Sequence, residues 1–597
     1  MSSGNRLAWR TVVAPTAGAG LIGGAIVGVA ESIWVLGLGA EWPGEYRALS
    51  LGALLYGLLG GLAGCVIGAA AAVALKRRRF DPLDVFGFGL GGVLAASLLV
   101  IFRFRHQRDV LHEFPLGALG QGIWLSASAA TGLFCCLVLP RLLRRWTASI
   151  GLGRCTLAWL LVVASTAGAA RLLPRSGETP FHPPQSAQPP RPHVLYLMVD
   201  ALRADYLSAY GDRDIETPAM ARLARDGIVF EQAISQSSWT RPSVATQLTS
   251  LPPHRHGARY KSSSIHPDAV LLTEALAAAG YYCVGSYNNG HIRPQWGFGR
   301  GYHRYHSSRR GRFGELVMPQ TVVAMWRSWR QATLRAEDVR GSAEQIFRVA
   351  REEWDAAPQG APIFLFVHLM DVHDPYFPRS TGGAAILRDD EAGAAERERF
   401  RRAYRDGIEY LDRQLQAFLQ WLDTKRLYDD TLIVLVSDHG EEFFEHGGYW
   451  HGLTLYDELI HVPLIMKLPQ NRLAGSTQAA LVRLLDVAPT IADVVGVASP
   501  PQWMGLPLIR GGVLVDPQLP YALSETDLEG GTVRALRGTK FKLILAGGRD
   551  RRRLPPSALF ELEADAGEQA NLASARNDQV QRLEAELTTE RDGDLWR

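Results

Sequence analysis

The first 170 residues are dominated by apolar stretches, and this feature limits the fold of the chain more than any other. Five stretches are rich in alanine, glycine, leucine and valine: 13–38, 49–75, 83–102, 116–139 and 155–170. Most are long enough to cross a bilayer core of about 30 Å as a helix. Four further stretches follow the first one, which argues against a cleaved signal peptide. We therefore predict an all-α transmembrane domain of five spans over residues 1–170.

Basic residues flank the predicted spans unevenly. The residues that would share one side of a membrane are Arg6, Arg10, Lys76, Arg77, Arg78, Arg79, Arg141, Arg144, Arg145 and Arg154. By the positive-inside rule this side is the cytoplasm, and Arg103, Arg105 and Arg108 in an opposite loop weaken the asymmetry without reversing it. An odd number of spans then places the chain after about residue 171 outside the cytoplasm. The pattern predicts a multi-pass protein of the plasma (inner) membrane.

The remainder of the chain has the composition of a soluble protein. Residues 171–193 are Pro-rich and polar, as is typical of a semi-rigid linker. Cys283 is the only cysteine after this linker, so no disulfide can form there and the region must depend on a hydrophobic core. The net charge of +3 gives no support for nucleic-acid binding, and we expect no nucleic-acid partner.

Short apolar runs alternate with helical patterns after the linker. Runs within 194–200, 362–378 and 431–442 are typical of strands buried on both faces, and 396–425 is a long amphipathic helix. This alternation predicts an α/β catalytic domain over 194–510, with a largely parallel, mixed sheet sandwiched by helices. Residues 511–597 form a predicted C-terminal subdomain with a small antiparallel sheet.

Polar residues stand where the predicted strands end. Asp200 ends the first run, the polar loop 368–376 ends the second, and Asp438 and His439 end the third. In open α/β sheets ligands bind outside the carboxyl ends of the strands. Asp200, Asp438 and His439, completed by Thr240, are suitable ligands for a divalent cation. An imidazole ligand favours manganese or zinc, and calcium, which prefers oxygen ligands, is the third candidate.

The stretch "SQSSWTRPSVATQLTS" (235–250) contains Thr240, which has two interpretations. Thr240 is a suitable N-cap for a helix that starts near Pro242. The same position would aim its hydroxyl at a metal-bound anion, where metal coordination would activate it as a nucleophile. His373 and His451 could then contact the anion or protonate a leaving oxygen. Taken singly, each residue is more often structural, as a turn, cap or loop residue, and only the joint pattern favours a site.

Four segments resemble successive blocks of the sulfatases, which belong to the alkaline-phosphatase superfamily. They are "VLYLMVDALRADYLSAYG", "SQSSWTRPSVATQLTSLPPHRHG", "TLIVLVSDHGEEFFEHGGYWHGLTLYDELIHVPLI" and "ALFELEADAGEQANLA". The blocks occur in family order and span about 194–575. The resemblance implies an α/β/α sandwich with a smaller C-terminal sheet, and hydrolysis or transfer at a sulfate or phosphate ester.

The resemblance also implies roles for single residues. Thr240 matches the nucleophile of the family, and Asp200, Asp438 and His439 match metal ligands. His373 and His451 match groups that contact the anion, and Asn288 or Asn289 matches a further substrate contact.

Two positions depart from the family pattern. Typical sulfatases have Cys or Ser followed by x-Pro-x-Arg, and the first residue is converted to formylglycine. Here these positions hold Thr240 and Val244. Because a threonine cannot yield that aldehyde, we expect no formylglycine. Ala201 follows Asp200 where family members often have a second acidic residue, so one carboxylate ligand is missing.

With an unmodified threonine at the nucleophile position, the chain resembles the lipoteichoic acid synthases and the lipid A phosphoethanolamine transferases, which also have five spans. The C-terminal block, in contrast, resembles the sulfatases proper. The leading hypothesis is a membrane-anchored, metal-dependent hydrolase or transferase that acts on phosphate or sulfate esters through Thr240. The first alternative is a lipid-donor phospho-group transferase that modifies a cell-envelope glycan or lipid. The second is a non-catalytic relative that binds an anionic glycan or lipid; the changes at Val244 and Ala201 motivate it, and the retained ligand set argues against it.

Overall fold

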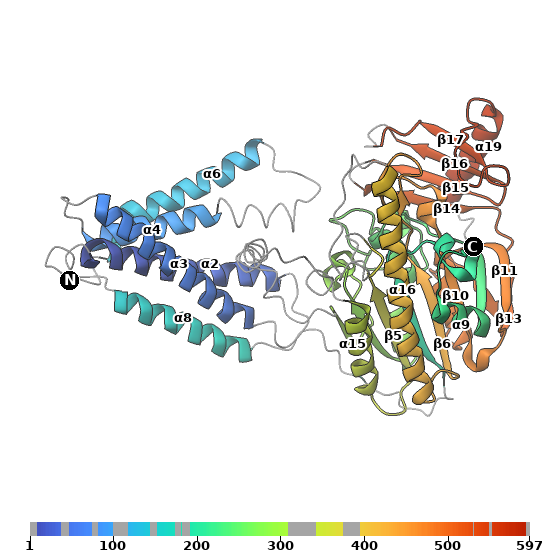
Figure 1. Cartoon of the computed structure of the whole chain (residues 1–597), viewed down its shortest axis with the longest axis horizontal. Helices are drawn as coiled ribbons and strands as arrows, with labels where there is room; N and C mark the ends of the chain where they lie inside the picture. The colour runs from blue at the N-terminus through green and yellow to red at the C-terminus, as the bar shows by residue number, and fades with distance from the viewer. Residues whose placement is uncertain are drawn as a thin grey trace. The chain divides into compact units, whose positions relative to one another are not determined.

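The computed structural model describes two compact units of the chain (Figure 1), one of apolar helices and one of mixed α/β structure. The described residues are 9–37, 47–74, 81–98, 118–143, 152–172, 181, 191–307, 342–373, 394–528, 531–547 and 552–592. Most of the predicted linker, and most of the basic residues that flank the predicted spans, lie outside these ranges.

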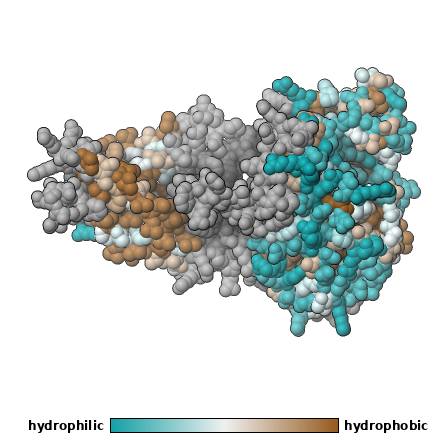
Figure 2. Space-filling view, viewed as in Figure 1, coloured by the Kyte–Doolittle hydropathy of each residue, from teal (hydrophilic) through white to brown (hydrophobic). Residues whose placement is uncertain are grey.

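The N-terminal unit consists of helices that coincide with the five predicted stretches. They are η1 (Trp9–Val13), α2 (Ala14–Gly37), α3 (Arg47–Ala74), α4 (Pro82–Ser97), α6 (Ala118–Leu133), η4 (Phe134–Val138), α7 (Leu139–Leu143) and α8 (Leu152–Leu172). Within the described helices, Thr11–Ile33, Leu49–Ala71 and Leu152–Ala169 are long and apolar enough to cross a membrane, while α4 is shorter. The number of spans stays a prediction. Figure 2 shows that the visible surface of these helices is largely apolar.

Helices α2 and α3 pack with their backbones in direct contact. A Cβ atom on Gly20 would lie 1.9 Å from the carbonyl oxygen of Gly60, and one on Gly28 would lie 2.2 Å from that of Gly52. Only glycine permits this approach, as at many helix contacts in membranes. The buried Glu31 of α2 also accepts a hydrogen bond from the hydroxyl of Tyr56 in α3.

The α/β unit is built on a nine-stranded sheet. Its strands are β1 (His193–Val199), β2 (Ile228–Ile234), β3 (Tyr282–Tyr287), β4 (Arg304–Ser307), β5 (Ile363–Leu369), β6 (Thr431–Ser437), β9 (His461–Val462), β10 (Leu464–Lys467) and β11 (Ser476–Arg483). The order is β11-β2-β10-β6-β1-β5-β3-β4, with β9 beside β2. Strand β1 is parallel to β5 and β6, whereas β10 is antiparallel to β2 and β6. The prediction of a mixed sheet is confirmed.

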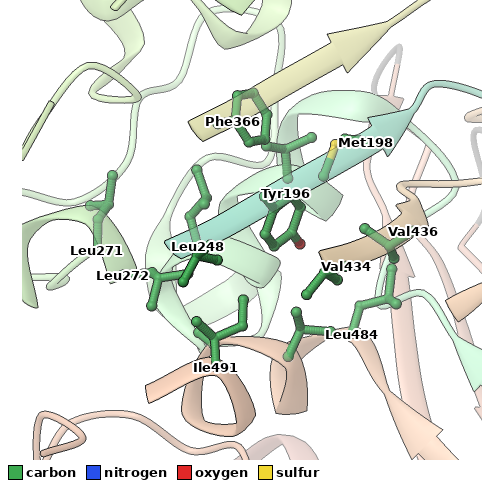
Figure 3. Close-up of a cluster of buried hydrophobic side chains, with 14 of the residues drawn as sticks. Tyr196, Met198, Leu248, Leu271, Leu272, Phe366, Val434, Val436, Leu484 and Ile491 are labelled. Carbon is green, nitrogen blue, oxygen red and sulfur yellow. The ribbon is translucent and has the colours of Figure 1, made fainter. Parts of the chain in front are cut away.

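Helices cover both faces of this sheet, because alternate residues of each strand point to opposite faces. One face carries α10 (Thr240–Thr249), α12 (Leu272–Ala278) and α18 (Val487–Val494), and Figure 3 shows their side chains against Tyr196, Met198 and Phe366. The other face carries α9 (Pro218–Asp226), α15 (Ala343–Asp355) and α16 (Ala394–Thr424), which pack against Leu195 and Leu197. Burial on both faces explains why β1 is one continuous apolar run.

A second, four-stranded antiparallel sheet follows in the same unit. It consists of β14 (Ala522–Thr526), β15 (Val533–Arg537), β16 (Phe541–Ala546) and β17 (Ser557–Glu561), with α19 (Asn577–Asp592) packed on it. The predicted C-terminal sheet is confirmed, while the boundary at residue 510 stays a prediction. Short elements complete the unit: η5 (Ala204–Tyr206), η6 (Ser208–Tyr210), α11 (Pro253–His256), η7 (Gly290–Ile292), η8 (Pro294–Trp296), β7 (Glu442–Phe443), β8 (Tyr449–Trp450), α17 (Asp457–Ile460), η11 (Pro469–Asn471), η12 (Leu484–Asp486), β12 (Ile509–Arg510) and β13 (Val513–Leu514).

Candidate active site

Three predicted metal ligands meet at the carboxyl ends of two neighbouring strands. Asp200 directly follows β1, and Asp438 and His439 directly follow β6, its parallel neighbour. One ligand atom from each of the three lies within 4.8 Å of the others, and all three residues are fully buried. The strand pairing therefore brings together residues that are more than 200 positions apart in the sequence.

The two oxygens of Asp200 have different surroundings. Oδ2 accepts a hydrogen bond from Nδ2 of Asn289 at 2.8 Å and lies 3.3 Å from Nε2 of His368. Oδ1 lies 3.4 Å from Nε2 of His439 and is buried with no hydrogen-bond donor among the described residues. Burial alone would raise the pKa of Asp200, but the neighbouring histidines, His373 foremost, hold it well below its usual value.

Like Asp200, Asp438 has one oxygen that accepts hydrogen bonds and one that has no donor among the described residues. Its Oδ1 accepts hydrogen bonds from the backbone N–H groups of His439 at 3.0 Å and Ala201 at 3.2 Å. Its Oδ2 is buried without a donor among the described residues. Burial, and then the charge of Asp200, raise the pKa of Asp438 well above its usual value. Two buried carboxylates this close require a cation between them or a shared proton.

His439 supplies a lone pair to the same space. Its Nδ1 lies 2.9 Å from the carbonyl oxygen of Gly440, which can only accept, so the proton resides on Nδ1. Nε2 is then unprotonated and faces Asp200 and Asp438 at 3.4 and 3.5 Å. An imidazole lone pair and two carboxylate oxygens without donors are a donor set that fits a divalent cation.

Thr240 is the first residue of α10, and the expectation that it caps this helix is wrong. The N-cap is Trp239, whose side chain makes no capping bond. The Oγ1 atom of Thr240 instead lies 3.5 Å from Oδ2 of Asp200 and 3.4 Å from Nε2 of His439. It also accepts a hydrogen bond from Nδ2 of Asn289 at 3.1 Å. Its hydroxyl therefore points into the carboxylate and imidazole cluster.

Two further histidines lie on the more accessible side of this cluster. His373 and His451 have side chains 18% and 16% exposed, whereas those of Asp200 and His439 are fully buried. Nε2 of His373 is 3.8 Å from Oδ1 of Asp200, and the ring of His451 lies 4.2 Å from that of His439. Of these four side chains, the two imidazoles are therefore the ones that solvent reaches.

The structure distinguishes the two candidate asparagines. Asn289 donates hydrogen bonds to both Asp200 and Thr240. Asn288 makes neither contact, and its side-chain oxygen and nitrogen are buried without partners among the described residues. Only Asn289 thus belongs to the cluster itself.

Sequence reasoning missed two residues beside the site. His368, near the end of β5, lies next to Met198 of β1 in the parallel register, which places its ring against Asp200. Glu441 accepts a hydrogen bond from Nδ1 of His451 at 3.0 Å. Both stand in polar segments that follow apolar runs, but this signal does not distinguish them from the other polar residues of those segments.

The structure also shows the surroundings of the two positions that depart from the sulfatase pattern, Val244 and Ala201. Val244 is buried in the core under α10. The guanidinium of the neighbouring Arg241 donates hydrogen bonds to the backbone carbonyls of Tyr260, Lys261, Ser263 and His291. Ala201 adopts a left-handed backbone conformation with φ 63°, which is uncommon for a residue with a Cβ atom.

Comparisons with known proteins cover the α/β unit. A family model described as Sulfatase matches residues 192–497, more than half of the 597 residues, and one described as N-sulphoglucosamine sulphohydrolase, C-terminal, matches 444–592. An ulvan-active sulfatase of Formosa agariphila is 23% identical over 378 residues, which cover 60% of this chain and 61% of that protein. A choline-sulfatase of Rhizobium meliloti is 25% identical over 455 residues, 67% of this chain and 86% of that protein. The chain thus spans less than two thirds of the length of the first of these relatives.

Solved structures share the fold. A structure in complex with D-glucosamine-2-N,6-O-disulfate has a TM-score of 0.53 at 18% identity and covers 68% of this chain and 99% of its own. A phosphonate monoester hydrolase of Agrobacterium radiobacter has a TM-score of 0.52 at 20% identity and covers 67% of this chain and 96% of its own. At these identities the similarity establishes the fold alone.

Proposed function

Because the chain belongs to the sulfatase family, we propose that it is a membrane-anchored, metal-dependent hydrolase or transferase that acts on phosphate or sulfate esters through Thr240. The family assignment makes the chain an enzyme of the ester-hydrolase type. The observation that carries the proposal is the position of Thr240 Oγ1, 3.5 Å from Asp200 and 3.4 Å from His439.

Asp200, Asp438 and His439 would hold the divalent cation. Their unsatisfied oxygens and the lone pair of His439 support this assignment. Manganese or zinc suits the mixed nitrogen and oxygen set better than calcium. When bound, the cation would supply positive charge that lowers the pKa of the Thr240 hydroxyl and offsets charge on the substrate.

Thr240 is the proposed nucleophile. Its Oγ1 would form a bond to phosphorus while the bond from phosphorus to the leaving oxygen breaks, which gives a phospho-threonine and a free alcohol. His451 or His373, the two accessible imidazoles, would protonate the leaving oxygen. A water molecule or an acceptor hydroxyl then displaces Thr240 and restores the enzyme.

Phosphorus is preferred over sulfur as the centre attacked. A threonine ester of phosphate is stable until a second nucleophile attacks it, and the histidines and the cation can assist that attack. A sulfated threonine would lack the aldehyde route by which formylglycine expels sulfate. Sulfate esters, which relatives such as the choline-sulfatase of Rhizobium meliloti are named for, remain the second substrate class.

Transfer from a lipid donor is the second candidate function. The apolar helices favour it, since Leu58, Leu62 and Val66 of α3 are 50–64% exposed, as expected for side chains that face lipid. Such helices would hold the outer unit close to membrane lipids and to cell-envelope glycans. The acceptor would then be a hydroxyl of an envelope glycan or lipid.

The test is the intact mass of the purified full chain after incubation with membrane lipids and a divalent cation. We expect a mass increase that maps to Thr240, is absent in Thr240→Ala and persists in Thr240→Ser, which retains a hydroxyl. The added mass identifies the transferred group. No adduct, together with no activity toward any phosphate or sulfate ester, would leave the non-catalytic binding protein as the better hypothesis.

A further inference from the structure

A short hairpin carries the contact between Glu441 and His451. Its strands, β7 and β8, pair antiparallel. Glu441 directly precedes β7 and His451 directly follows β8, so the two residues meet at the open end of the hairpin, where they form their 3.0 Å hydrogen bond. The position of the His451 ring, 4.2 Å from the ring of His439, therefore depends on how the hairpin is held.

His446 lies between β7 and β8, at the closed end of this hairpin, and both of its ring nitrogens have partners. Nδ1 lies 2.7 Å from Oε1 of Glu458 in α17, and Nε2 lies 3.1 Å from the backbone carbonyl oxygen of Glu568. The ring is also parallel to that of Tyr456, with the two centroids 3.5 Å apart. His446 thus ties the hairpin to α17 and to the loop between β17 and α19.

These two partners require a protonated ring. A carboxylate and a backbone carbonyl only accept hydrogen bonds, whereas a neutral imidazole has a single N–H to donate. A neutral ring would keep one contact and lose the other, and the amide of Gln569, 3.3 Å from Nε2, could then donate to that nitrogen in place of the bond to Glu568. The hairpin is therefore held at both points only while His446 carries a charge.

The charged groups around His446 leave one carboxylate for it. The other ion pairs on the elements packed here are Arg552–Glu442, Lys542–Asp457, Lys542–Glu568, Arg537–Asp457 and Arg203–Glu445. Among the described residues, Glu458 forms an ion pair with His446 alone. Burial by itself would lower the pKa of His446, but the hydrogen bond and the charge of Glu458 raise it above its usual value. Burial also raises the pKa of Glu568 to about 7, so this carboxyl is the second group here that titrates near neutrality.

We propose that protonated His446 is a positioning residue, which fixes the hairpin and through it the place of Glu441 and His451 beside the cluster around Thr240. This inference rests on the proposed function, because it describes how pH regulates the same site. The folded chain binds the proton of His446 more tightly than the unfolded chain. The contact is therefore complete below about pH 6.5 and is lost as the pH rises through the higher pKa of the folded state. The site is ordered at acidic to neutral pH and loosens in alkali.

The first test measures the proton and the hairpin directly. In the detergent-solubilised full chain with 13C-labelled histidine, one Cε1 resonance should be missing in His446→Gln and thereby be assigned. Its titration midpoint should lie above about 6.5, the value of a free histidine, and should be lower in Glu458→Gln. The protection of peptides spanning 441–451 from hydrogen exchange, corrected for the intrinsic effect of pH, should fall at the same midpoint. A midpoint at or below 6.5, or protection that does not follow it, would overturn the proposal.

The second test uses two variants that predict opposite changes in activity. We would measure kcat from pH 6 to 9 with bis(p-nitrophenyl) phosphate and p-nitrophenyl sulfate, with a saturating divalent cation. Glu458→Gln keeps the shape of the partner without its charge, so its kcat relative to the native chain should fall by about 5-fold between the two titration midpoints. His446→Gln cannot be protonated, so its relative kcat should be lowest at pH 6 and rise above the native midpoint. A purely structural defect would lower the relative kcat equally at every pH.

Glu561→Gln is the matched control. Glu561 of β17 has a side chain 22% exposed, pairs with Lys540 and Arg576, and makes no described contact with His446. This variant should keep the native titration and the native pH profile. Equal pH profiles in the native chain, Glu458→Gln and His446→Gln would overturn the positioning role and leave the proposed function intact. No turnover of either substrate, with titration and protection as expected, would overturn the proposed function while the pH-dependent anchor of the hairpin stands.

Discussion

Glu441 orients one of the two accessible imidazoles. Its Oε1 lies 3.0 Å from Nδ1 of His451 and fixes the orientation of that ring. We predict that Glu441→Gln lowers kcat by about 10–100-fold with a smaller effect on KM, because the amide no longer stabilises the protonated ring. Steady-state kinetics at fixed pH measure the effect.

The neighbouring Glu442 provides the matched control. Its carboxylate pairs with Arg552 at 2.8 and 3.0 Å and does not contact His451 in the described structure. Glu442→Gln should lower the melting temperature while the folded enzyme keeps its kcat. Equal losses of kcat in both variants would contradict a specific role for Glu441.

Removal of the metal should destabilise the chain through Asp200 and Asp438. Their unsatisfied oxygens repel one another when no cation is present. After chelation, added manganese or zinc at 100 times its Kd should stabilise the folded state by about 2.7 kcal/mol. Thermal unfolding and elemental mass spectrometry report the stability and the bound metal.

Two aspartate variants make this prediction specific. Asp200→Asn removes a proposed ligand and should abolish the metal-dependent rise in melting temperature. Asp205→Asn changes a carboxylate that is 57% exposed and pairs with Arg203, and should leave that rise intact. A metal response that survives Asp200→Asn would place the metal elsewhere.

The sequence identified the centre of the site better than its surroundings. Asp200, Thr240, Asp438 and His439 could be predicted because each follows or begins a distinct element, and such ends converge at one edge of a sheet. His368 and Glu441 could not, since their roles depend on which strands are neighbours and on how a loop turns after β6. The structure shows where these residues lie, while the catalytic roles of Thr240, His373 and His451 and the metal-ligand roles of the cluster stay predictions.

At the scale of elements, His256 of α11 holds the start of α10. Its Nε2 lies 3.1 Å from both Thr246 Oγ1 and the carbonyl oxygen of Pro242, and its Nδ1 accepts from the backbone N–H of Ala258. Burial lowers the pKa of His256 from 6.5 to about 3. The folded state therefore keeps this ring neutral where the unfolded chain would protonate it.

This difference predicts a loss of stability in acid. The contribution of His256 is complete above about pH 6.5 and falls by about 1.4 kcal/mol per pH unit below it, toward the folded pKa. His256→Gln should be less stable than the native chain at pH 7.5. Between pH 7.5 and 5, however, the melting temperature of the variant should fall by less than that of the native chain. His266→Gln, at an exposed side chain, should keep the native pH dependence. An unchanged pH dependence in His256→Gln would contradict the assignment.

Helices α2 and α3 depend on glycine for their contact. We predict that Gly20→Leu lowers the free energy of unfolding by about 1–3 kcal/mol or more, because its Cβ would overlap the backbone of Gly60. The melting temperature of the detergent-solubilised chain measures this effect. Gly92→Leu in α4 is the control, since no described atom lies within 4 Å of the added Cβ. Similar losses in both variants would show that helix propensity, rather than the close contact, is responsible.

Elements with a continuous local pattern were predicted well, and those that depend on distant partners were not. β1, β6 and α16 coincide with apolar or amphipathic runs. The antiparallel placement of β10 between β2 and β6 left no comparable signal, because strand order depends on contacts between residues far apart in the chain. Helix α10 begins at Thr240 rather than at Pro242, because the backbone N–H of Ser243 donates a hydrogen bond to the carbonyl oxygen of Trp239.

At the scale of the whole molecule, the order of the two units predicts the side of the membrane on which the enzyme acts. Three described helices satisfy the length and hydropathy of a membrane span. If α4 and the segment from α6 to α7 also cross, the number becomes five. Both numbers are odd, so with either number we predict that the α/β unit and the N-terminus are on opposite sides of the membrane. The flanking arginines and lysines favour a cytoplasmic N-terminus.

Cysteine labelling tests this topology. Asp268 has a side chain 94% exposed, and Asp268→Cys should react with a membrane-impermeant maleimide in intact spheroplasts. Cys283 is fully buried, so the unsubstituted α/β unit should label only after denaturation, which makes the native chain the control. Reaction of Asp268→Cys only after the membrane is permeabilised would place the unit in the cytoplasm. That result would exclude an odd number of spans with a cytoplasmic N-terminus. It would also contradict the transferase hypothesis, which requires that the α/β unit reach outer-leaflet lipids and envelope glycans.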